Sequence, residues 1–188
     1  MTRTWLRRLS LLLLLTWVPT GQAAEKEKKP ADPAHPAAKT AVKRLGGTGA
    51  WNAYSYKEKS GRVCYLAGSP HKSEPVKPKR KPPVAMVTHR PEENVANVVS
   101  FVEGSALKEG SDASLDVDGA HFDLFTKGDT AWSRTSDLDK TITEAMAKGQ
   151  QAVFKAALQK GPTTIDTYSL SGFAQTLTLI DKACGIKR

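Results

Sequence analysis

SLDVDGAHFDLFT, residues 114–126, carries the clearest folding signal in the chain. Apolar side chains alternate with polar ones before the dipeptide Asp118-Gly119 and again after it. Alternation on both sides of Asp-Gly predicts a β-hairpin with one buried face. His121 and Asp123 then fall on the opposite, solvated face, and two such side chains are too few to argue for a metal site.

The segments around this hairpin are short, apolar and rich in β-branched or aromatic residues, which predicts more strands. They are residues 51–57, 62–68, 83–90, 97–104, 151–159 and 163–170. Helical spacing appears twice: over 136–149, with Ser136 as the N-cap and Gly149 as the stop, and over 173–184, with Ser171 as the cap. Many short strands within one domain's length predict a mainly β sandwich, with a short helix near 137–148 and a C-terminal helix near 173–184.

The amino terminus is typical of a secretory signal peptide over residues 1–23. Three arginines precede an apolar run from Leu9 to Val18, and small residues follow up to Ala23. A retained membrane helix would need about 20 apolar residues, so we expect cleavage, no membrane span and a periplasmic or further exported protein. Loss of the three arginines lowers the formal charge of the chain from +9 to +6. Residues 24–50 are rich in Ala, Lys and Pro without an aromatic residue, which predicts a disordered tether before a domain at 51–188.

The chain has two cysteines, Cys64 and Cys184. In an exported protein, an isolated pair favours one disulfide. Two separate buried thiols are the alternative, and they suit an oxidising compartment less well. Two distant cysteines supply too few ligands for a metal site.

Several motifs in this order give the chain a family resemblance: WNAYSY from Trp51, GRVCYLAGSP, MVTHRP around His89, FDLFTKGDTAW ending at Trp132, AMAKG, and DTYSLSGF…LIDKAC from Asp166. In these motifs the chain resembles the invasion-associated locus B family of exported bacterial proteins, over essentially the whole segment from Trp51 to Cys184. The resemblance implies an immunoglobulin-like β-sandwich in a Gram-negative envelope, without a recognised catalytic centre. It also implies a link to host-cell invasion, after which the founding members are named.

The segment TTIDTYSLSGF, residues 163–173, gathers Asp166, Tyr168 and two serines. We interpret this segment as a strand that leads into a helix, and in that arrangement no nucleophile lies beside a base. We therefore assign structural roles to Asp166, Tyr168 and Ser171, and likewise to Trp51, His89 and Trp132. The alternative is a hydrolase that uses Ser169 or Ser171 with His89 as its base. His89 itself is interpreted as a strand-end histidine bonded to nearby groups rather than as a ligand or a pH sensor. We expect no enzymatic turnover, no cofactor and no metal.

The most unusual surface feature is HKSEPVKPKRKPP, residues 71–83, where four prolines are interleaved with cations. The cations of this candidate binding loop are Lys72, Lys77, Lys79, Arg80 and Lys81. One interpretation is docking to an envelope polyanion or an envelope protein, and a surface or secreted virulence factor that touches host cells is the alternative. A solvated loop without a partner explains the pattern equally well. Nucleic acid is a poorer candidate, because no aromatic residue is interleaved for stacking on bases.

Overall fold

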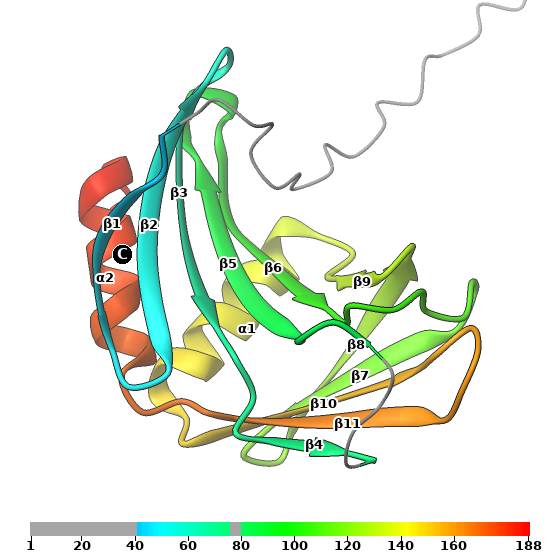
Figure 1. Cartoon of the computed structure of the whole chain (residues 1–188). Coiled ribbons are helices and arrows are strands. Elements are labelled where there is room, and N and C mark those ends of the chain that lie inside the picture. Colours follow the sequence, from blue (N-terminus) through cyan, green and yellow to red (C-terminus); the bar gives the residue numbers. More distant parts are fainter. Residues whose placement is uncertain (1–40, 76–79) are drawn as a thin grey trace, which may run out of the picture. The chain divides into compact units, whose positions relative to one another are not determined.

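The computed structural model describes residues 41–75 and 80–188, and one antiparallel sheet of eleven strands dominates it (Figure 1). The strand order is β1-β2-β3-β5-β6-β9-β8-β7-β10-β11-β4. The strands in chain order are β1 Lys43–Thr48, β2 Trp51–Glu58, β3 Gly61–Gly68, β4 Lys72–Glu74, β5 Val84–Arg90, β6 Val95–Val102, β7 Asp112–Val117, β8 Ala120–Lys127, β9 Thr130–Trp132, β10 Gln151–Ala157 and β11 Thr163–Ser169. The helices are η1 Pro91–Glu93, α1 Ser136–Lys148 and α2 Phe173–Cys184. The prediction of a mainly β fold with these two α-helices is confirmed.

The predicted hairpin is β7–β8, which pairs Val117 with Ala120 across Asp118-Gly119. Both turn residues have positive φ, 49° and 93°, as a two-residue type I′ turn requires. The Asp118 carboxylate also accepts the backbone N–H groups of Gln150 and Gln151 at 2.6 and 3.1 Å. The turn therefore fixes the start of β10 as well as the hairpin.

The two halves of the sheet face each other through aromatic side chains. Phe101 of β6 stacks on Phe154 of β10 with ring centroids 4.5 Å apart, and its edge meets Tyr168 of β11 at 5.7 Å. Trp51 of β2 lies 4.9 Å from Phe173 of α2 in an edge-on arrangement. The sandwich core is thus formed within one continuous sheet, whose inner face is buried on both halves.

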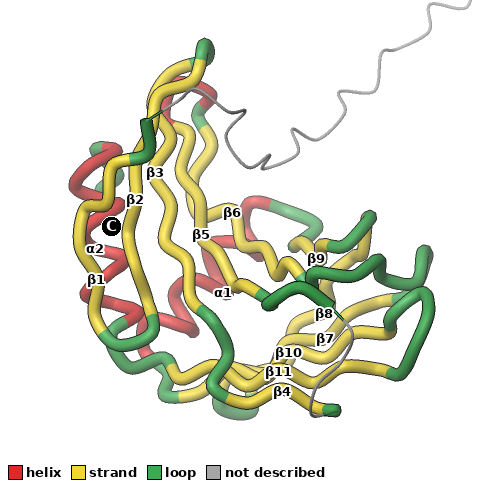
Figure 2. Tube along the Cα trace, viewed as in Figure 1, coloured by secondary structure: helices red, strands yellow, loops and turns green. Residues whose placement is uncertain are grey.

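Both α-helices contribute side chains to this core (Figure 2). Helix α2 packs against β1, β2 and β3, and α1 packs against β6. Thr135, not Ser136, is the N-cap of α1: its hydroxyl accepts the Leu138 N–H at 3.2 Å. Asp139 of α1 accepts the Val99 N–H at 2.8 Å, which satisfies β6 where its pairing with β9 has ended. The helix α1 therefore seals an edge that would otherwise carry a buried, unbonded donor.

The start of α2 differs from the prediction. Gly172, with φ of 87°, occupies the N-cap position without a side-chain bond, and the Ser171 N–H donates to Ser169 Oγ at 3.3 Å. Ser171 is therefore not a side-chain cap. A Cβ at residue 172 would collide with the backbone of Thr48, so close approach of β1 explains the glycine.

Strand β1 corrects the predicted boundary of the tether at residue 50. Lys43–Thr48 pairs with β2, and α2 packs against it, with Leu179 lying over Gly46. Its sequence, KRLGGT, has a single apolar side chain and therefore no alternation to detect. The predicted signal peptide and most of the predicted tether lie outside the described residues. No helix within 41–75 and 80–188 is long and apolar enough to cross a membrane.

Candidate functional site

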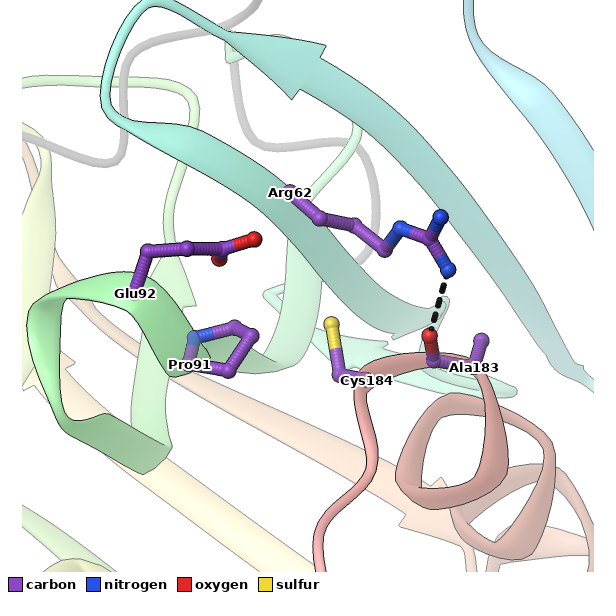
Figure 3. Close-up of a pocket in the computed structure, with 5 residues that line it drawn as sticks. All are labelled: Arg62, Pro91, Glu92, Ala183 and Cys184. Atoms are coloured by element: carbon purple, nitrogen blue, oxygen red, sulfur yellow. Dashed lines mark hydrogen bonds between the residues drawn. The ribbon is translucent and has the colours of Figure 1, made fainter.

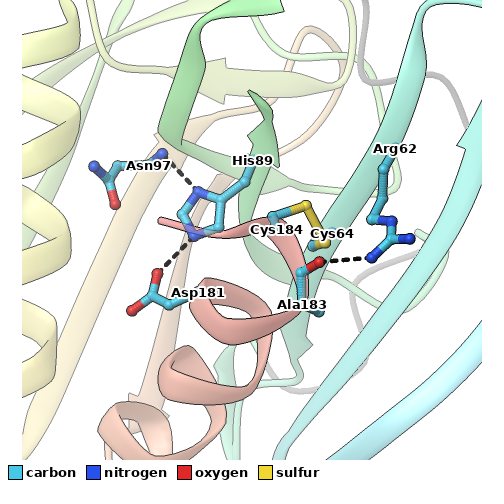
Figure 4. Close-up of a disulfide and its surroundings, with 7 residues drawn as sticks. All are labelled: Arg62, Cys64, His89, Asn97, Asp181, Ala183 and Cys184. Atoms are coloured by element: carbon cyan, nitrogen blue, oxygen red, sulfur yellow. Dashed lines mark hydrogen bonds and ion pairs between the residues drawn. A yellow bond between two sulfur atoms is a disulfide. The ribbon is translucent and has the colours of Figure 1, made fainter. Parts of the chain in front are cut away.

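The predicted disulfide is present: Cys64 of β3 is bonded to Cys184 at the end of α2, with Cα atoms 6.0 Å apart (Figure 4). A depression of about 360 Å³ lies beside it (Figure 3). Its lining residues are Arg62, Pro91, Glu92, Ala183 and Cys184. The Arg62 guanidinium already donates to the Ala183 carbonyl at 2.9 Å, and the sulfur is oxidised, so the lining of this depression offers no nucleophile.

His89 lies next to the disulfide, and both of its ring nitrogens are bonded (Figure 4). Nε2 donates to the Asp181 carboxylate at 2.9 Å, because Nδ1 accepts the Asn97 N–H at 3.0 Å. Burial alone would raise the pKa of Asp181, but hydrogen bonds from His89 and Arg188 outweigh it and lower the pKa. His89 therefore orients the end of α2, as a structural histidine does.

The hydrolase alternative needs His89 beside Ser169 or Ser171, and the structure does not bring them together. The ring bonds to Asp181 and Asn97 instead, while the Ser169 hydroxyl accepts the Ser171 N–H. A serine without a base in hydrogen-bond reach is not activated. These residues show no catalytic arrangement.

Trp51 and Tyr168 lie in the core, as their structural assignment requires. Trp51 is 1% exposed, and its indole N–H donates to the Ser169 carbonyl at 2.8 Å. Tyr168 is fully buried, and burial, with the charges of Asp166 and Glu103, raises the pKa of its hydroxyl well above the ordinary value. The Tyr168 hydroxyl has no hydrogen-bond partner within the described part of the chain.

Arg80 corrects the picture of residues 71–83 as a freely solvated cationic loop. Its side chain is 1% exposed and lies between two buried carboxylates, Glu103 and Asp166. It donates to Asp166 Oδ1 at 2.5 Å and to Glu103 Oε2. Ser73 of β4 donates to the same Asp166 oxygen at 2.5 Å, so one carboxylate holds both ends of the segment between them. Arg80 is an anchor and not a docking residue.

The other cations of the loop have different surroundings. Lys72 pairs with Glu74 at 2.5 Å on the surface. Lys81 is exposed, with no ion pair among the described residues. Lys77 and Lys79 lie outside the described residues. Among the described cations of the loop, Lys81 is therefore the one that is both exposed and without an ion pair.

The buried carboxylates make stability depend on pH. Burial, then the charge of Asp166, raises the pKa of Glu103 from 4.5 to about 7, against the opposing effects of Arg80 and Thr164. Because the folded-state pKa is the higher one, the stabilisation from this group is complete below pH 4.5 and is lost as pH rises to about 7. We expect the free energy of unfolding of the wild type to fall, relative to that of Glu103→Gln, by roughly 3 kcal/mol over this range.

Urea denaturation of both proteins at a series of pH values measures this difference. The comparison with Glu103→Gln removes the contributions of the other carboxylates, which the two proteins share. A constant difference from pH 4.5 to 7.5 would show that Glu103 titrates as it does in the unfolded chain.

The outer face of the first half of the sheet carries a second cluster, which is aromatic. Strand register places Tyr54, Tyr65, Thr88 and Val98 in one row across β2, β3, β5 and β6. A parallel row runs through Asn52, Ala67, Met86, Ser100, Trp132 and Phe125. Because neighbouring residues alternate, these side chains point away from the face that carries Cys64 and Phe101. We call the surface formed by Tyr54, Tyr65, Met86, Val98, Phe125 and Trp132 the aromatic face.

No α-helix of the described residues covers the aromatic face. The disulfide ties α2 to the opposite side of β3, and α1 contributes Ile142 and Met146 to the inner core. The rings of Tyr54 and Tyr65 stack at 5.1 Å, and the Arg134 guanidinium lies 5.8 Å above Phe125. All six side chains that define the face are half-buried. A half-buried aromatic surface that no described α-helix covers is a candidate interaction site.

Two polar atoms in this face have no hydrogen-bond partner in the described chain. They are Thr88 Oγ1 and Ser100 Oγ, on residues that are 4% and 1% exposed. Buried hydroxyls are normally bonded. Both oxygens are themselves buried, so they lie beneath the aromatic side chains and are not accessible to a molecule bound on the face.

Comparison of the chain with known proteins identifies its family. The family model described as invasion associated locus B (IalB) protein matches residues 51–181. The chain belongs to the invasion-associated locus B family. The crystal structure of invasion associated protein B from Bartonella henselae is similar in fold, with a TM-score of 0.51 and 16% sequence identity over 72% of this chain and 94% of that chain. No curated protein matches the chain.

Sequence reasoning missed two parts of the site in this locus B domain. Glu103 ends the apolar run NVVSFVE and carried no signal of its own, because its partners Arg80 and Asp166 are distant in sequence. The aromatic face was detectable in part. Strand β6 is apolar at consecutive positions 98 and 99, which indicates a strand with apolar side chains on both faces.

Proposed function

We propose that this protein is an exported, non-enzymatic component of the bacterial envelope that binds a partner protein through the aromatic face. The observation that carries the proposal is a set of Tyr, Trp, Phe and Met side chains on a sheet face without a covering α-helix. These residue types are enriched where protein interfaces are most buried, and Lys and Glu are depleted there. The aromatic face itself contains neither Lys nor Glu.

The rim of the face favours a partner with acidic groups. Arg44 is exposed beside Tyr54 and donates to the neutral amide of Asn52 at 2.7 Å, and it forms no ion pair with a carboxylate of residues 41–75 or 80–188. Arg134, at the opposite end, pairs with exposed Asp112. An unneutralised cation at one end of an aromatic surface steers acidic partners and fixes their orientation.

Two features support the compartment that we propose, the leader-like residues 1–23 and the disulfide. Both support export to an oxidising compartment, and we place the protein in the periplasm. An invasion role at the cell surface is the alternative, in keeping with the name of the family. Protease treatment of intact cells separates the two, because only a surface protein is cleaved.

The test is a cross-linked pull-down from intact cells with the wild type, Tyr65→Ser and Trp132→Ser. We expect partner recovery to fall at least about 30-fold, since truncation of a central aromatic residue at an interface typically costs ~2 kcal/mol or more. Ile165→Ser, an outward apolar side chain on distant β11, is the matched control and should retain the partner. Equal recovery from all four proteins would contradict the proposal.

A second candidate function, docking to an envelope polyanion, is supported by exposed Lys81. Replacement of Lys72, Lys77, Lys79 and Lys81 by glutamine tests it without disturbing buried Arg80. Loss of envelope association at low salt would support polyanion docking. Unchanged association would leave the aromatic face as the binding surface.

A further inference from the structure

The aromatic face has charges of opposite sign at its two ends. Arg44 of β1 is exposed at one end, where it lies opposite Tyr54 of β2. At the other end, Phe125 of β8 lies opposite Trp132 of β9. Asp123, two residues before Phe125, is exposed on the same side of β8 and extends the row that contains Tyr54. Neither Arg44 nor Asp123 forms an ion pair within residues 41–75 and 80–188.

Other charges around the face are paired within the chain or lie away from this row. The pairs are Glu58 with Arg90, Asp112 with Arg134, and Asp116 with His121. Lys127 lies four residues from Asp123 along β8, which is about 13 Å. A molecule bound along the row that contains Tyr54 therefore meets an unpaired cation at one end and an unpaired anion at the other.

We propose that the partner on the aromatic face is a second copy of this chain, related to the first by a two-fold axis that runs along β5. This inference rests on the binding role proposed above and names the partner. In a two-fold interface both copies use the same surface, so a surface with unlike charges at its ends is complementary to itself. The order β1-β2-β3-β5-β6-β9-β8 places three strands on each side of β5. Rotation about β5 therefore sets β1 of one copy opposite β8 of the other, and Arg44 and Asp123 form two symmetric ion pairs.

The apolar side chains between the two ends are complementary under the same rotation. Tyr65 of β3 meets Val98 of β6, because these strands flank β5 and the two residues share a row. In the next row, Met86 of β5 lies on the axis and meets the second Met86. Phe125 meets Gly47 of β1, which has no side chain to obstruct the aromatic ring. The packing thus has apolar contacts at its centre and ion pairs at its rim, as protein interfaces do.

Sedimentation equilibrium of the full-length chain tests the self-association, over about 1–100 μM protein to cover micromolar dissociation constants. We expect Arg44→Glu and Asp123→Arg, each alone, to raise the dissociation constant at least about 30-fold, because each sets like charges opposite one another at both ends. An equal mixture of the two variants should dimerise within about threefold of the wild type, since each reversed charge then faces its opposite. Lys182→Glu, exposed on α2 at the other side of the sheet, is the matched control and should leave the dissociation constant unchanged.

A monomer at every concentration, dimers that persist in both single variants, or a mixture that associates no better than its components would each overturn the two-fold packing. The pull-down, repeated with two differently tagged copies of the chain, distinguishes this inference from the proposed function. A monomeric chain that recovers a different protein, which Trp132→Ser loses, would refute the second copy and retain binding at the face. Equal recovery of every protein by the wild type and Trp132→Ser, the second tagged copy included, would refute binding at the face itself.

Discussion

Replacing Cys64 and Cys184 by alanine should lower the free energy of unfolding by about 5 kcal/mol. The disulfide joins residues 120 apart, and a cross-link over a loop of this length removes that much loop-closure entropy from the unfolded chain in the chain-entropy model. Small domains have a total stability of only about 5–15 kcal/mol, so the double variant is close to unfolding at 37 °C. Urea denaturation of the variant and the oxidised wild type measures the difference.

The reduced wild type is the control, because it lacks the covalent link but keeps both side chains. It should unfold at nearly the same urea concentration as the alanine variant. A loss below about 1 kcal/mol in both would show that the packing of α2, through Phe173, Leu177 and Ile180, holds the helix without the covalent link.

Arg80→Met should destabilise the protein by about 3–5 kcal/mol, because it leaves two carboxylates buried without their cation. Glu103 and Asp166 are both fully buried, and Arg80 is the cation that bonds to each of them. Lys81→Met, at the exposed neighbouring position, is the matched control and should change stability by less than about 0.5 kcal/mol. Chemical denaturation at pH 7.5 gives both values.

A compensating variant separates charge from packing. Arg80→Met combined with Glu103→Gln and Asp166→Asn removes all three charges and should recover most of the lost stability. If the combined variant is as unstable as Arg80→Met alone, the arginine stabilises the protein by filling space and not by neutralising the acids.

Local patterns predicted the elements that depend on neighbouring residues. The hairpin at 114–126 and both α-helices follow from alternation, the Asp-Gly turn and helical spacing, and the structure confirms them. The disulfide followed from composition and compartment, because two cysteines can form only one pair. These predictions required no knowledge of how distant segments meet.

What failed depended on distant pairing. Strand β1 forms because it pairs with β2 and packs against α2, whereas its own residues show no alternation that predicts a strand. Arg80 resembles its lysine neighbours in sequence, yet it is buried because two acids from β11 and the end of β6 meet behind it. A buried cation can be told from an exposed one only when its counter-charges are located.

The convergence of Ser73 and Arg80 on one oxygen of Asp166 has a consequence for engineering. Hydrogen bonds to Asp166 fix Ser73 and Arg80 to the domain, at the two ends of the intervening segment. We therefore expect the stability of the domain to depend little on the length of that segment. Closing a longer loop costs little additional entropy, about 0.6 kcal/mol for each doubling of length. Residues 75–79 are therefore a suitable insertion point for an affinity tag or a foreign epitope, and we expect the domain to keep its fold around the insertion.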